Sequence, residues 1–277
     1  MNISVLPTLD IVIPCYQASD TLERAVASCL QQNNYQHIIL VDDGSTDNTW
    51  QIMQRLKAEH PHIITLKMPE NSGVACARNW ATLHSQAELV AFLDADDTYQ
   101  KGALYPIAEA FHYLPELSLI RLKFIPINLS PLLSEHPNFP IAWETLQMTG
   151  AGNTIFRRNI LLACGGFPQD ELFKHLGGED GALGIAFEKT AMIGTLFEEE
   201  YQGVQLYCRE GMHAERLLRA VLFNEHHPLI TEEVIAHANN ITNTIVTRLK
   251  QCQMALQSTT KGRTPITITY NKPNKEH

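Results

Sequence analysis

The chain has 277 residues, of which 44% are hydrophobic and 18% are charged, and its formal net charge at pH 7 is -9. This composition predicts a folded protein with a buried core and argues against intrinsic disorder. Because an acidic surface repels a polyanion, it also argues against broad binding of nucleic acid, although one small anionic ligand beside a cation is still compatible with it.

Short apolar runs alternate with amphipathic stretches through the first hundred residues. The runs that predict buried strands span residues 9–13, 38–41, 63–66 and 89–93. Asp20 and Asp47 are the expected N-caps of the first two helices, with Glu23 in capping-box position after Asp20, and a third helix is expected over residues 74–84. Strands that alternate with helices of this length predict βαβ units and a mostly parallel sheet.

The pattern is looser after residue 100. We expect a helix over residues 103–114, a strand outside the parallel set over 119–127, and a short strand over 153–157. Four prolines predict a loop over residues 126–140, and glycines clustered between residues 165 and 184 predict turns. Thr231 is the expected cap of a long helix that ends near Gln257, and the polar residues from Ser258 onward predict a mobile tail.

Cysteine usage and the termini bear on where the protein resides. The six cysteines form no CxxC pair, which predicts reduced thiols in a reducing compartment. No signal peptide is evident, and no apolar run approaches the roughly 20 residues that cross a bilayer. We therefore expect a cytoplasmic protein, and leave open a peripheral position at the inner face of the plasma membrane.

Acidic turns follow two of the predicted strands. Asp42-Asp43 follows the second strand and Asp94-Ala95-Asp96-Asp97 follows the fourth. Ligands bind at the carboxyl ends of parallel strands, and Mg²⁺ or Mn²⁺ prefers oxygen ligands together with substrate phosphates. The second turn therefore predicts a divalent-metal site, against the alternative that its residues only shape a turn or cap a helix. For Asp42-Asp43, binding of a uracil-type base and a simple Asp-Gly turn both stay open.

Five segments between residues 11 and 97 form an ordered set. They read IVIPCYQ at 11–17, RAVASCLQQ at 24–32, VDDGSTDNT at 41–49, NSGVACARN at 71–79 and FLDADD at 92–97. In this order they resemble the family 2 glycosyltransferases of the GT-A fold.

The second half of the chain resembles that family more loosely. The similar positions are Gly152-Asn153 with Arg157-Arg158, Gly165-Gly166-Phe167, Glu179-Asp180 and His213 in REGMHAER. The sequence after Asp180 lacks the family's usual aromatic residue and arginine, which leaves the acceptor undetermined. The absence of a QxxRW motif argues against processive synthesis of a polymer.

The resemblance implies a fold and a division of labour. The implied fold is α/β of the GT-A type, which is Rossmann-like, with a mixed, mostly parallel sheet flanked by helices and a C-terminal helical extension. Residues 1–115 would bind the nucleotide-sugar donor, and residues 116–225 would bind the acceptor and carry the catalytic base. Residues 226–277 would form the C-terminal helix and a flexible tail.

The resemblance also implies roles for individual residues. Asp180, beside Glu179, would be the catalytic base. The residues implied on the donor side are Pro14, Tyr16, Asp42, Asp43, Arg78, Asp94, Ala95 and Asp96. The implied metal ligands are Asp96, Asp94, Asp97 and His213. For Arg78 a salt bridge on the helix surface is the alternative, and for His213 the alternative is a polar surface residue.

The implied function is transfer of a sugar, with inversion, from a nucleotide-diphosphate donor to a hydroxyl group, assisted by Mn²⁺ or Mg²⁺. A UDP-sugar is the expected donor, and the acceptor would be a glycan, a lipid-linked molecule or a protein, as in polysaccharide biosynthesis. A homodimer stays open. The alternatives are a non-catalytic nucleotide-sugar binding module and a sugar nucleotidylyltransferase, although residues 14–21 lack that enzyme's glycines and lysine. An oxidoreductase is disfavoured because no GxGxxG follows the first strand.

Overall fold

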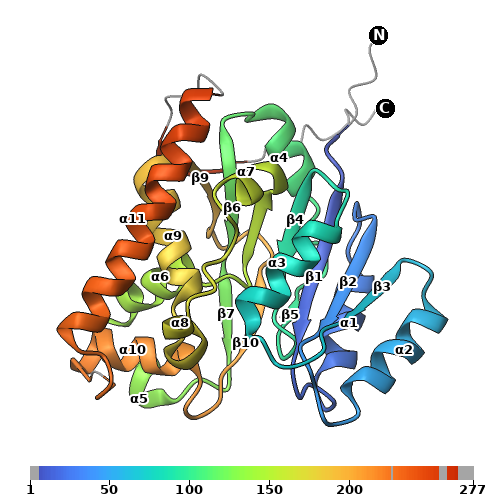
Figure 1. Ribbon diagram of the computed structural model, residues 1–277, viewed down its shortest axis with the longest axis horizontal. Coiled ribbons are helices and arrows are strands. Elements are labelled where there is room, and N and C mark those ends of the chain that lie inside the picture. The colour runs from blue at the N-terminus through green and yellow to red at the C-terminus, as the bar shows by residue number, and fades with distance from the viewer. Residues whose placement is uncertain (1–5, 226, 256–260, 268–277) are drawn as a thin grey trace, which may run out of the picture.

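The computed structural model describes residues 6–225, 227–255 and 261–267. Its centre is a mixed sheet of eight strands (Figure 1). In spatial order the strands are β11 (Gly262–Pro265), β9 (Met192–Leu196), β6 (Leu117–Leu122), β8 (Thr154–Arg157), β4 (Leu89–Phe92), β1 (Leu9–Cys15), β2 (His37–Asp42) and β3 (Ile63–Lys67). Neighbours are parallel except at β8, which runs antiparallel to both β4 and β6. The prediction of a mixed, mostly parallel sheet is confirmed.

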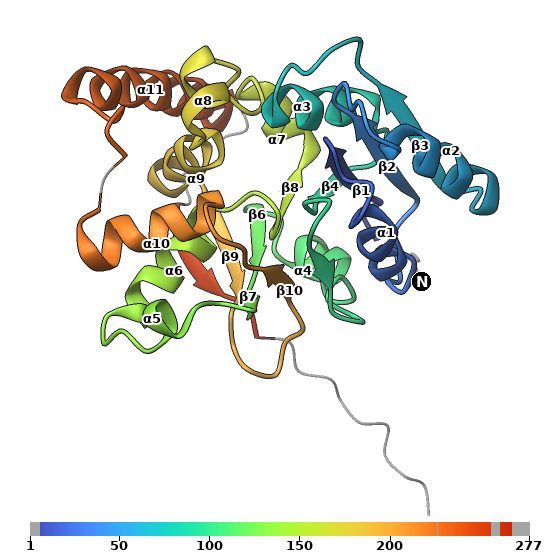
Figure 2. The ribbon, with the colours of Figure 1, turned by 90° about the horizontal axis from the view of Figure 1, so that it is seen from below.

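A second, small sheet lies beside the end of β4. It consists of β5 (Thr98–Tyr99), β10 (Val204–Tyr207) and β7 (Phe124–Ile127), with β10 in the middle. β10 is antiparallel to β5 and parallel to β7. This sheet brings the residues after β10 next to the acidic turn after β4 (Figure 2).

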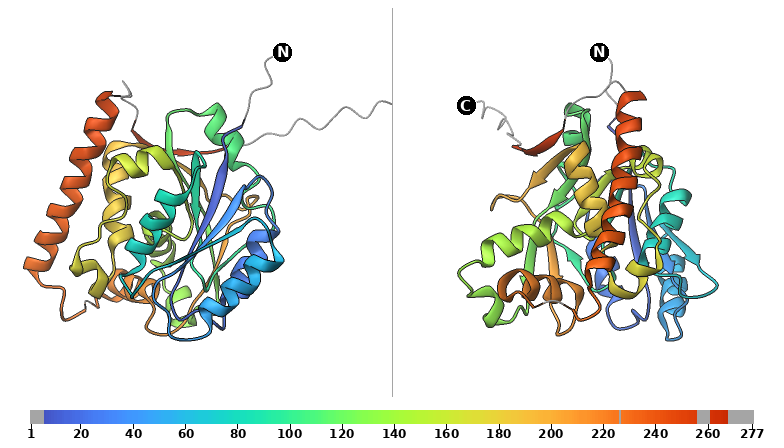
Figure 3. Two further views of the ribbon diagram at one scale, coloured as in Figure 1. Left: turned by 45° about the vertical axis from the view of Figure 1, so that its right-hand side comes forward. Right: turned by 60° about the vertical axis from the view of Figure 1, so that its left-hand side comes forward.

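Helices cover both faces of the main sheet (Figure 3). Side chains alternate along a strand, so that Ile11 and Ile13 join one core while Val12 joins the other. The first core is completed by α1 (Leu22–Leu30), α2 (Thr49–Glu59), α4 (Ile107–Tyr113), α5 (Pro131–Ser134), α6 (Phe139–Thr149) and α10 (His213–Phe223). The second is completed by α3 (Val74–His84), α7 (Arg158–Ala163), α9 (Glu179–Thr190) and α11 (Glu232–Ala255). Burial on both faces explains why the strands appear as continuous apolar runs.

The strand order reverses beside β1, which pairs with β2 on one side and with β4 on the other. In an open α/β sheet such a reversal leaves a crevice at the carboxyl ends of the two central strands, and ligands bind there. The residues that follow β1 and β4 therefore meet at the ligand-binding edge of the sheet.

Several local predictions are wrong. The helix α1 begins at Leu22 after Thr21 and has no side-chain cap, so Asp20 does not cap it. The expected strand over 119–127 is two strands, and the first of them, β6, belongs to the main sheet and pairs parallel with β9. Strand pairing is a long-range property that alternation within one segment does not reveal.

The expected loop over residues 126–140 contains the end of β7, the helix α5 and the start of α6. Proline occupies the first turn of both helices, where its missing N–H costs nothing. The helix expected over 103–114 begins only at Ile107, after Pro106. Gly181 and Gly184 lie inside α9 rather than in turns.

The expected cap of α11 is confirmed, because Val234 N–H donates to Thr231 Oγ1 at 3.3 Å at the start of that helix. The expected cap of α2 is wrong, because Asn48 occupies the N-cap position and no side chain caps the helix; Asp47 Oδ1 instead accepts Thr49 N–H at 3.0 Å. Part of the expected mobile tail is ordered, because β11 pairs with β9. The helix end expected at Gln257 and tail residues 258–260 and 268–277 lie outside the described residues.

The six cysteines, all within the described part of the chain, are free thiols. Among the helices described, none is both long enough and apolar enough to cross a lipid bilayer.

Candidate functional site

The acidic turn Asp94-Ala95-Asp96-Asp97 follows β4 at the edge where the strand order reverses. It stands between two hollows. One, of about 500 Å³, is lined by Pro14, Tyr16 and Ala95, and the other, of about 430 Å³, is lined by Glu179, Asp180 and His213. The residues that line both are Val74, Asp94, Asp96 and Arg209. The turn thus forms the boundary between the two hollows.

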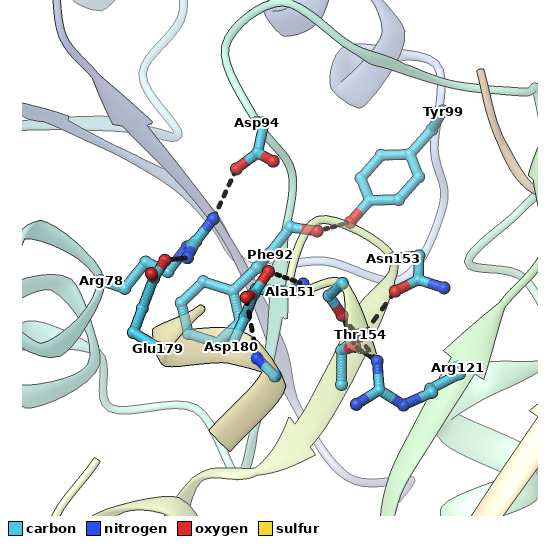
Figure 4. Close-up of polar contacts among 12 residues, drawn as sticks. Arg78, Phe92, Asp94, Tyr99, Arg121, Ala151, Asn153, Thr154, Glu179 and Asp180 are labelled. Atoms are coloured by element: carbon cyan, nitrogen blue, oxygen red, sulfur yellow. Dashed lines mark hydrogen bonds and ion pairs between the residues drawn. The ribbon is translucent and has the colours of Figure 1, made fainter. Parts of the chain in front are cut away.

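Arg78 connects this turn to the second acidic segment. From α3, its Nη2 donates to Asp94 Oδ1 at 2.7 Å and its Nη1 donates to Glu179 Oε1 at 3.0 Å (Figure 4). Burial by itself lowers the pKa of Arg78, but the charges of Asp94, Glu179 and Asp180 outweigh it and raise that pKa above its ordinary value. The alternative of a surface salt bridge is wrong, because the side chain of Arg78 is only 4% exposed.

The other two carboxylates of the turn have partners from β10 and from the residues after it. Asp96 forms an ion pair with Arg209, and its backbone oxygen accepts a hydrogen bond from Arg24 Nη2 at 2.7 Å. Asp97 is buried, and its Oδ1 accepts the N–H of Tyr207 at 2.9 Å. Burial raises the pKa of Asp97 well above its usual range, and the charges of Asp94 and Asp96 add to this shift.

The donor atoms of the turn fit a hard divalent cation. Asp94 and Asp96 present carboxylate oxygens, and such ions bind one or two carboxylates together with substrate phosphates and water. Gly152 leaves room beside Asp94, since a Cβ there would lie 3.0 Å from Asp94 Oδ2. Within the described ranges, however, no group of three or more His, Cys, Asp or Glu side chains is gathered as a metal site.

His213 is the first residue of α10 and lines the 430 Å³ hollow with the acidic turn. Its Nδ1 lies 3.3 Å from Arg216 Nη2, and a Cβ on Gly177 would lie 2.8 Å from the same nitrogen. The imidazole therefore sits against the loop that precedes α9.

Glu179 and Asp180 occupy the first turn of α9, after Gly178 in the left-handed conformation with φ of 96°. Asp180 is half-buried, and it accepts Gly181 N–H on Oδ1 at 2.8 Å and Ala151 N–H on Oδ2 at 3.3 Å. Glu179 is buried against Arg78. Burial raises the pKa of Glu179 to about 7, the charge of Asp180 adds to this shift, and the charge of Arg78 opposes it.

Asp42 is the last residue of β2 and Asp43 follows it, and both carboxylates accept hydrogen bonds from backbone amides. Asp43 accepts Ser72 N–H at 2.8 Å and Gly73 N–H at 2.9 Å, one on each carboxylate oxygen, while Asp42 Oδ1 accepts Ser45 N–H at 3.0 Å. Burial raises the pKa of Asp43. Neither residue lines either hollow. Their hydrogen bonds instead hold the backbone of the loops beside the site.

Sequence reasoning missed several residues of the site. Arg209 forms an ion pair with Asp96. It lies in the REGMHAER segment, from which only His213 was predicted as a site residue. Arg24 lies in the RAVASCLQQ segment, and Gly152 was noted only for resemblance. Their contacts join positions more than 50 residues apart in the sequence, and a motif read locally does not contain them.

A doubly covered α/β sheet with an acidic turn between two hollows at its strand-reversal point is the arrangement of a GT-A glycosyltransferase fold. Residues 10–161, more than half of the chain, match the family model described as Glycosyl transferase family 2. The chain belongs to that family.

Two curated relatives illustrate the similarity in sequence. The chain is 31% identical over 225 residues to the poly-beta-1,6-N-acetyl-D-glucosamine synthase of Staphylococcus aureus (strain MSSA476), covering 74% of this chain and 53% of that protein. It is 36% identical over 94 residues to the succinoglycan biosynthesis protein ExoU of Rhizobium meliloti (strain 1021), covering 34% of this chain and 28% of that protein. The chain thus spans about half or less of the length of these relatives.

Solved structures of low sequence identity share the fold. Staphylococcus aureus TarS 1–349 in complex with UDP matches with a TM-score of 0.58 at 20% identity, over 90% of this chain and 75% of that one. The mannosyltransferase PcManGT from Pyrobaculum calidifontis, in complex with GDP-Man and Mn²⁺, matches with a TM-score of 0.58 at 19% identity. The match covers 92% of this chain and 76% of that one. Both confirm the GT-A architecture.

Proposed function

We propose that the protein transfers a sugar, with inversion, from a nucleoside-diphosphate donor, a UDP-sugar, to a hydroxyl acceptor. The observation that carries this proposal is the position of the turn holding Asp94 and Asp96. It lines both hollows, with Pro14 and Tyr16 in one and Asp180 in the other. A diphosphate at the turn would place the nucleoside on the first side and the sugar on the second.

On the donor side, Pro14 and the exposed Tyr16 would contact the nucleoside, since both line the 500 Å³ hollow. Asp42 and Asp43 would act by holding the loops next to it, and the remaining lone pairs of Asp43 could accept a base N–H. Arg78 would keep Asp94 oriented toward the donor.

The metal belongs to the same proposal. Asp94 and Asp96, next to Ala95, would hold Mn²⁺ or Mg²⁺, with Asp97 and His213 as further ligands from the sequence-based prediction. Such an ion neutralises the charge that develops on a departing diphosphate. The complex of PcManGT with GDP-Man and Mn²⁺ supports this part of the proposal by analogy of fold.

Asp180 would accept the proton of the attacking hydroxyl group. Its carboxylate lines the 430 Å³ hollow and is held by two backbone N–H groups, so its direction is fixed while a lone pair on each oxygen stays available. Glu179, which accepts a hydrogen bond from Arg78, would help to hold the first turn of α9 and thereby Asp180 in place. No second carboxylic acid is required if the cation assists departure of the diphosphate.

The wider assignment follows the same division. Residues 1–115 would bind the donor and residues 116–225 the acceptor, while residues 226–277 would contribute the C-terminal helix. The resemblance implies the acceptor class, which is a glycan, a lipid-linked molecule or a protein. A cytoplasmic location, with or without contact to the inner face of the membrane, is proposed from the isolated cysteines. A homodimer is a further proposal.

The Asp180→Asn variant tests the proposal. We expect transfer to be lost while calorimetry still detects donor binding, because the amide is isosteric with the carboxylate but cannot take the proton. Normal turnover by this variant would refute the role of Asp180. A wild-type chain that binds the donor and never releases nucleoside diphosphate would instead be the non-catalytic binding module.

A further inference from the structure

Arg121 is a buried cation on the central strand β6, only 1% exposed. Across the described residues, no carboxylate forms an ion pair with it within 4.0 Å. Its Nη1 donates instead to three neutral oxygens, at 2.6 Å to Gly150 O, 2.9 Å to Thr154 Oγ1 and 3.3 Å to Gln147 O. Burial lowers the pKa of Arg121 to about 10. Burying a guanidinium without a counter-ion costs desolvation free energy, which suggests that Arg121 has a role beyond packing.

One of these contacts leads directly to Asp180. Gly150 O and Ala151 N belong to the same peptide group, whose oxygen accepts from Arg121 and whose N–H donates to Asp180 Oδ2 at 3.3 Å (Figure 4). A peptide group is planar and rigid, so fixing its oxygen also fixes the direction of its N–H. A donor on one side and an acceptor on the other also polarise the group cooperatively.

The helix that carries Asp180 packs against the same guanidinium. Gly184 lies one turn after Asp180 in α9, and a Cβ at that position would lie 2.8 Å from Arg121 Nη2. The charge of Asp180 also raises the pKa of Arg121, which places the two groups within electrostatic reach. Arg121 is therefore linked to Asp180 in two ways. One is the peptide group between Gly150 and Ala151, and the other is the packing of α9 against the guanidinium at Gly184.

We propose that Arg121 is a positioning residue, which orients the carboxylate of Asp180 toward the acceptor hydroxyl through the peptide between Gly150 and Ala151. The inference rests on the proposed function, in which Asp180 is the base. The purely structural alternative is that Arg121 only ties down the carbonyl groups at the end of α6. That role would change stability without changing turnover by the folded protein.

Arg157 provides a matched control. It lies at the far end of the neighbouring strand β8, is half-buried, and donates to Leu117 O at 2.6 Å and Phe111 O at 2.7 Å. It lines neither hollow of the site. Arg121→Met and Arg157→Met therefore both remove a guanidinium bound to backbone carbonyl groups, but only the first touches the peptide that contacts Asp180.

The experiment measures kcat per folded molecule, the donor Kd and the melting temperature for both variants. We expect both to melt earlier, but only Arg121→Met to lose kcat, by about 100-fold, because a small misplacement of a reacting group has an effect of that size. The donor Kd should stay within twofold of that of the unsubstituted chain. Arg121→Lys, which keeps the charge but not the planar fork, should recover part of the kcat that Arg121→Met loses. An unchanged kcat in Arg121→Met, or an equal loss in Arg157→Met, overturns the proposal.

Thr154→Val covers the case in which Arg121→Met does not fold. Thr154 Oγ1 accepts from Arg121 and donates to Gly150 O at 2.9 Å, so valine removes this support at nearly constant volume. We expect kcat to fall by less than the roughly 100-fold expected for Arg121→Met, because Arg121 itself remains, with the donor Kd unchanged. Full turnover by Asp180→Asn would refute the role of Asp180 as the base, on which this inference rests. Loss of turnover in Asp180→Asn with full turnover in Thr154→Val would refute only the role of Arg121.

Discussion

Arg78 and Asp94 are joined by a hydrogen-bonded ion pair of 2.7 Å that ties α3 to the turn after β4. The other arm of the same guanidinium bonds Glu179 at 3.0 Å, so one cation serves carboxylates on two different elements. The side chains of Arg78 and Glu179 are 4% and 8% exposed, whereas that of Asp94 is 38% exposed. The pair with Glu179 is therefore the buried one, and Asp94 keeps one side open to the hollows.

Removal of this cation should destabilise the fold. In Arg78→Met, Glu179 would be buried without a counter-charge, and we expect the free energy of unfolding to fall by about 3 kcal/mol. Urea denaturation measures this change. The control is Arg55→Met, because Arg55 pairs with Glu23 where both side chains are at least half-exposed, and its loss should stay below about 1 kcal/mol. Equal losses in the two variants would show that the buried pair with Glu179 does not set the cost.

Stability should depend on pH through Glu179. Its pKa is about 7 in the folded chain against an ordinary value of 4.5, so between these values the native state holds a proton that the unfolded chain has lost. Its contribution to the free energy of unfolding therefore falls as pH rises through this window and levels off above pH 7. Glu179→Gln removes that dependence. Unfolding of both proteins at pH 5, 6, 7 and 8 should show the original chain losing stability relative to the variant, and a difference independent of pH would contradict this prediction.

The metal assignment predicts a specific defect in Asp96→Ala. Calorimetry of donor binding with Mn²⁺, and again with a chelator, should show that the variant has lost the metal-dependent part of the affinity. Asp20→Ala is the control, because Asp20 also lines the 500 Å³ hollow but lies outside the acidic turn. If the two variants bind the donor alike, the turn does not hold the cation.

Gly166 should not tolerate a side chain. Its φ is 75°, and a Cβ would lie 2.3 Å from Asn79 Oδ1, which accepts the N–H of Phe167 at 2.8 Å. We expect Gly166→Ala to lose about 2 kcal/mol in thermal or urea unfolding, from backbone strain and from the displaced amide. Gly181→Ala is the contrasting change, because a Cβ there meets nothing within 4 Å inside α9, and it should gain roughly 0.5–1 kcal/mol. A stable Gly166→Ala protein would mean that Asn79 moves aside at little cost.

Much of the first half of the chain could be predicted because its signals are local. Each apolar run was followed within a few residues by the polar groups it positions, as Val12 and Ile13 are followed by Tyr16, and Phe92 by Asp94. The second half was predicted less well, because β9, β10 and α9 depend on partners distant in the chain. The helices α5 and α6 were missed because prolines were interpreted as loop residues when they occupy first turns.

The order of the first strands and helices along the chain, and the two acidic turns at the carboxyl ends of β2 and β4, could be predicted from the sequence alone. These are consequences of side-chain periodicity and of chain direction in a parallel sheet. The partner of each charge depends on the folded chain: Arg78 lies between Asp94 and Glu179, Asp43 binds the backbone at Ser72 and Gly73, and Arg121 reaches Asp180 through one peptide. The physical reason is that electrostatic and hydrogen-bonding partners are set by distance in space, and the chain brings these groups together from up to 101 residues apart.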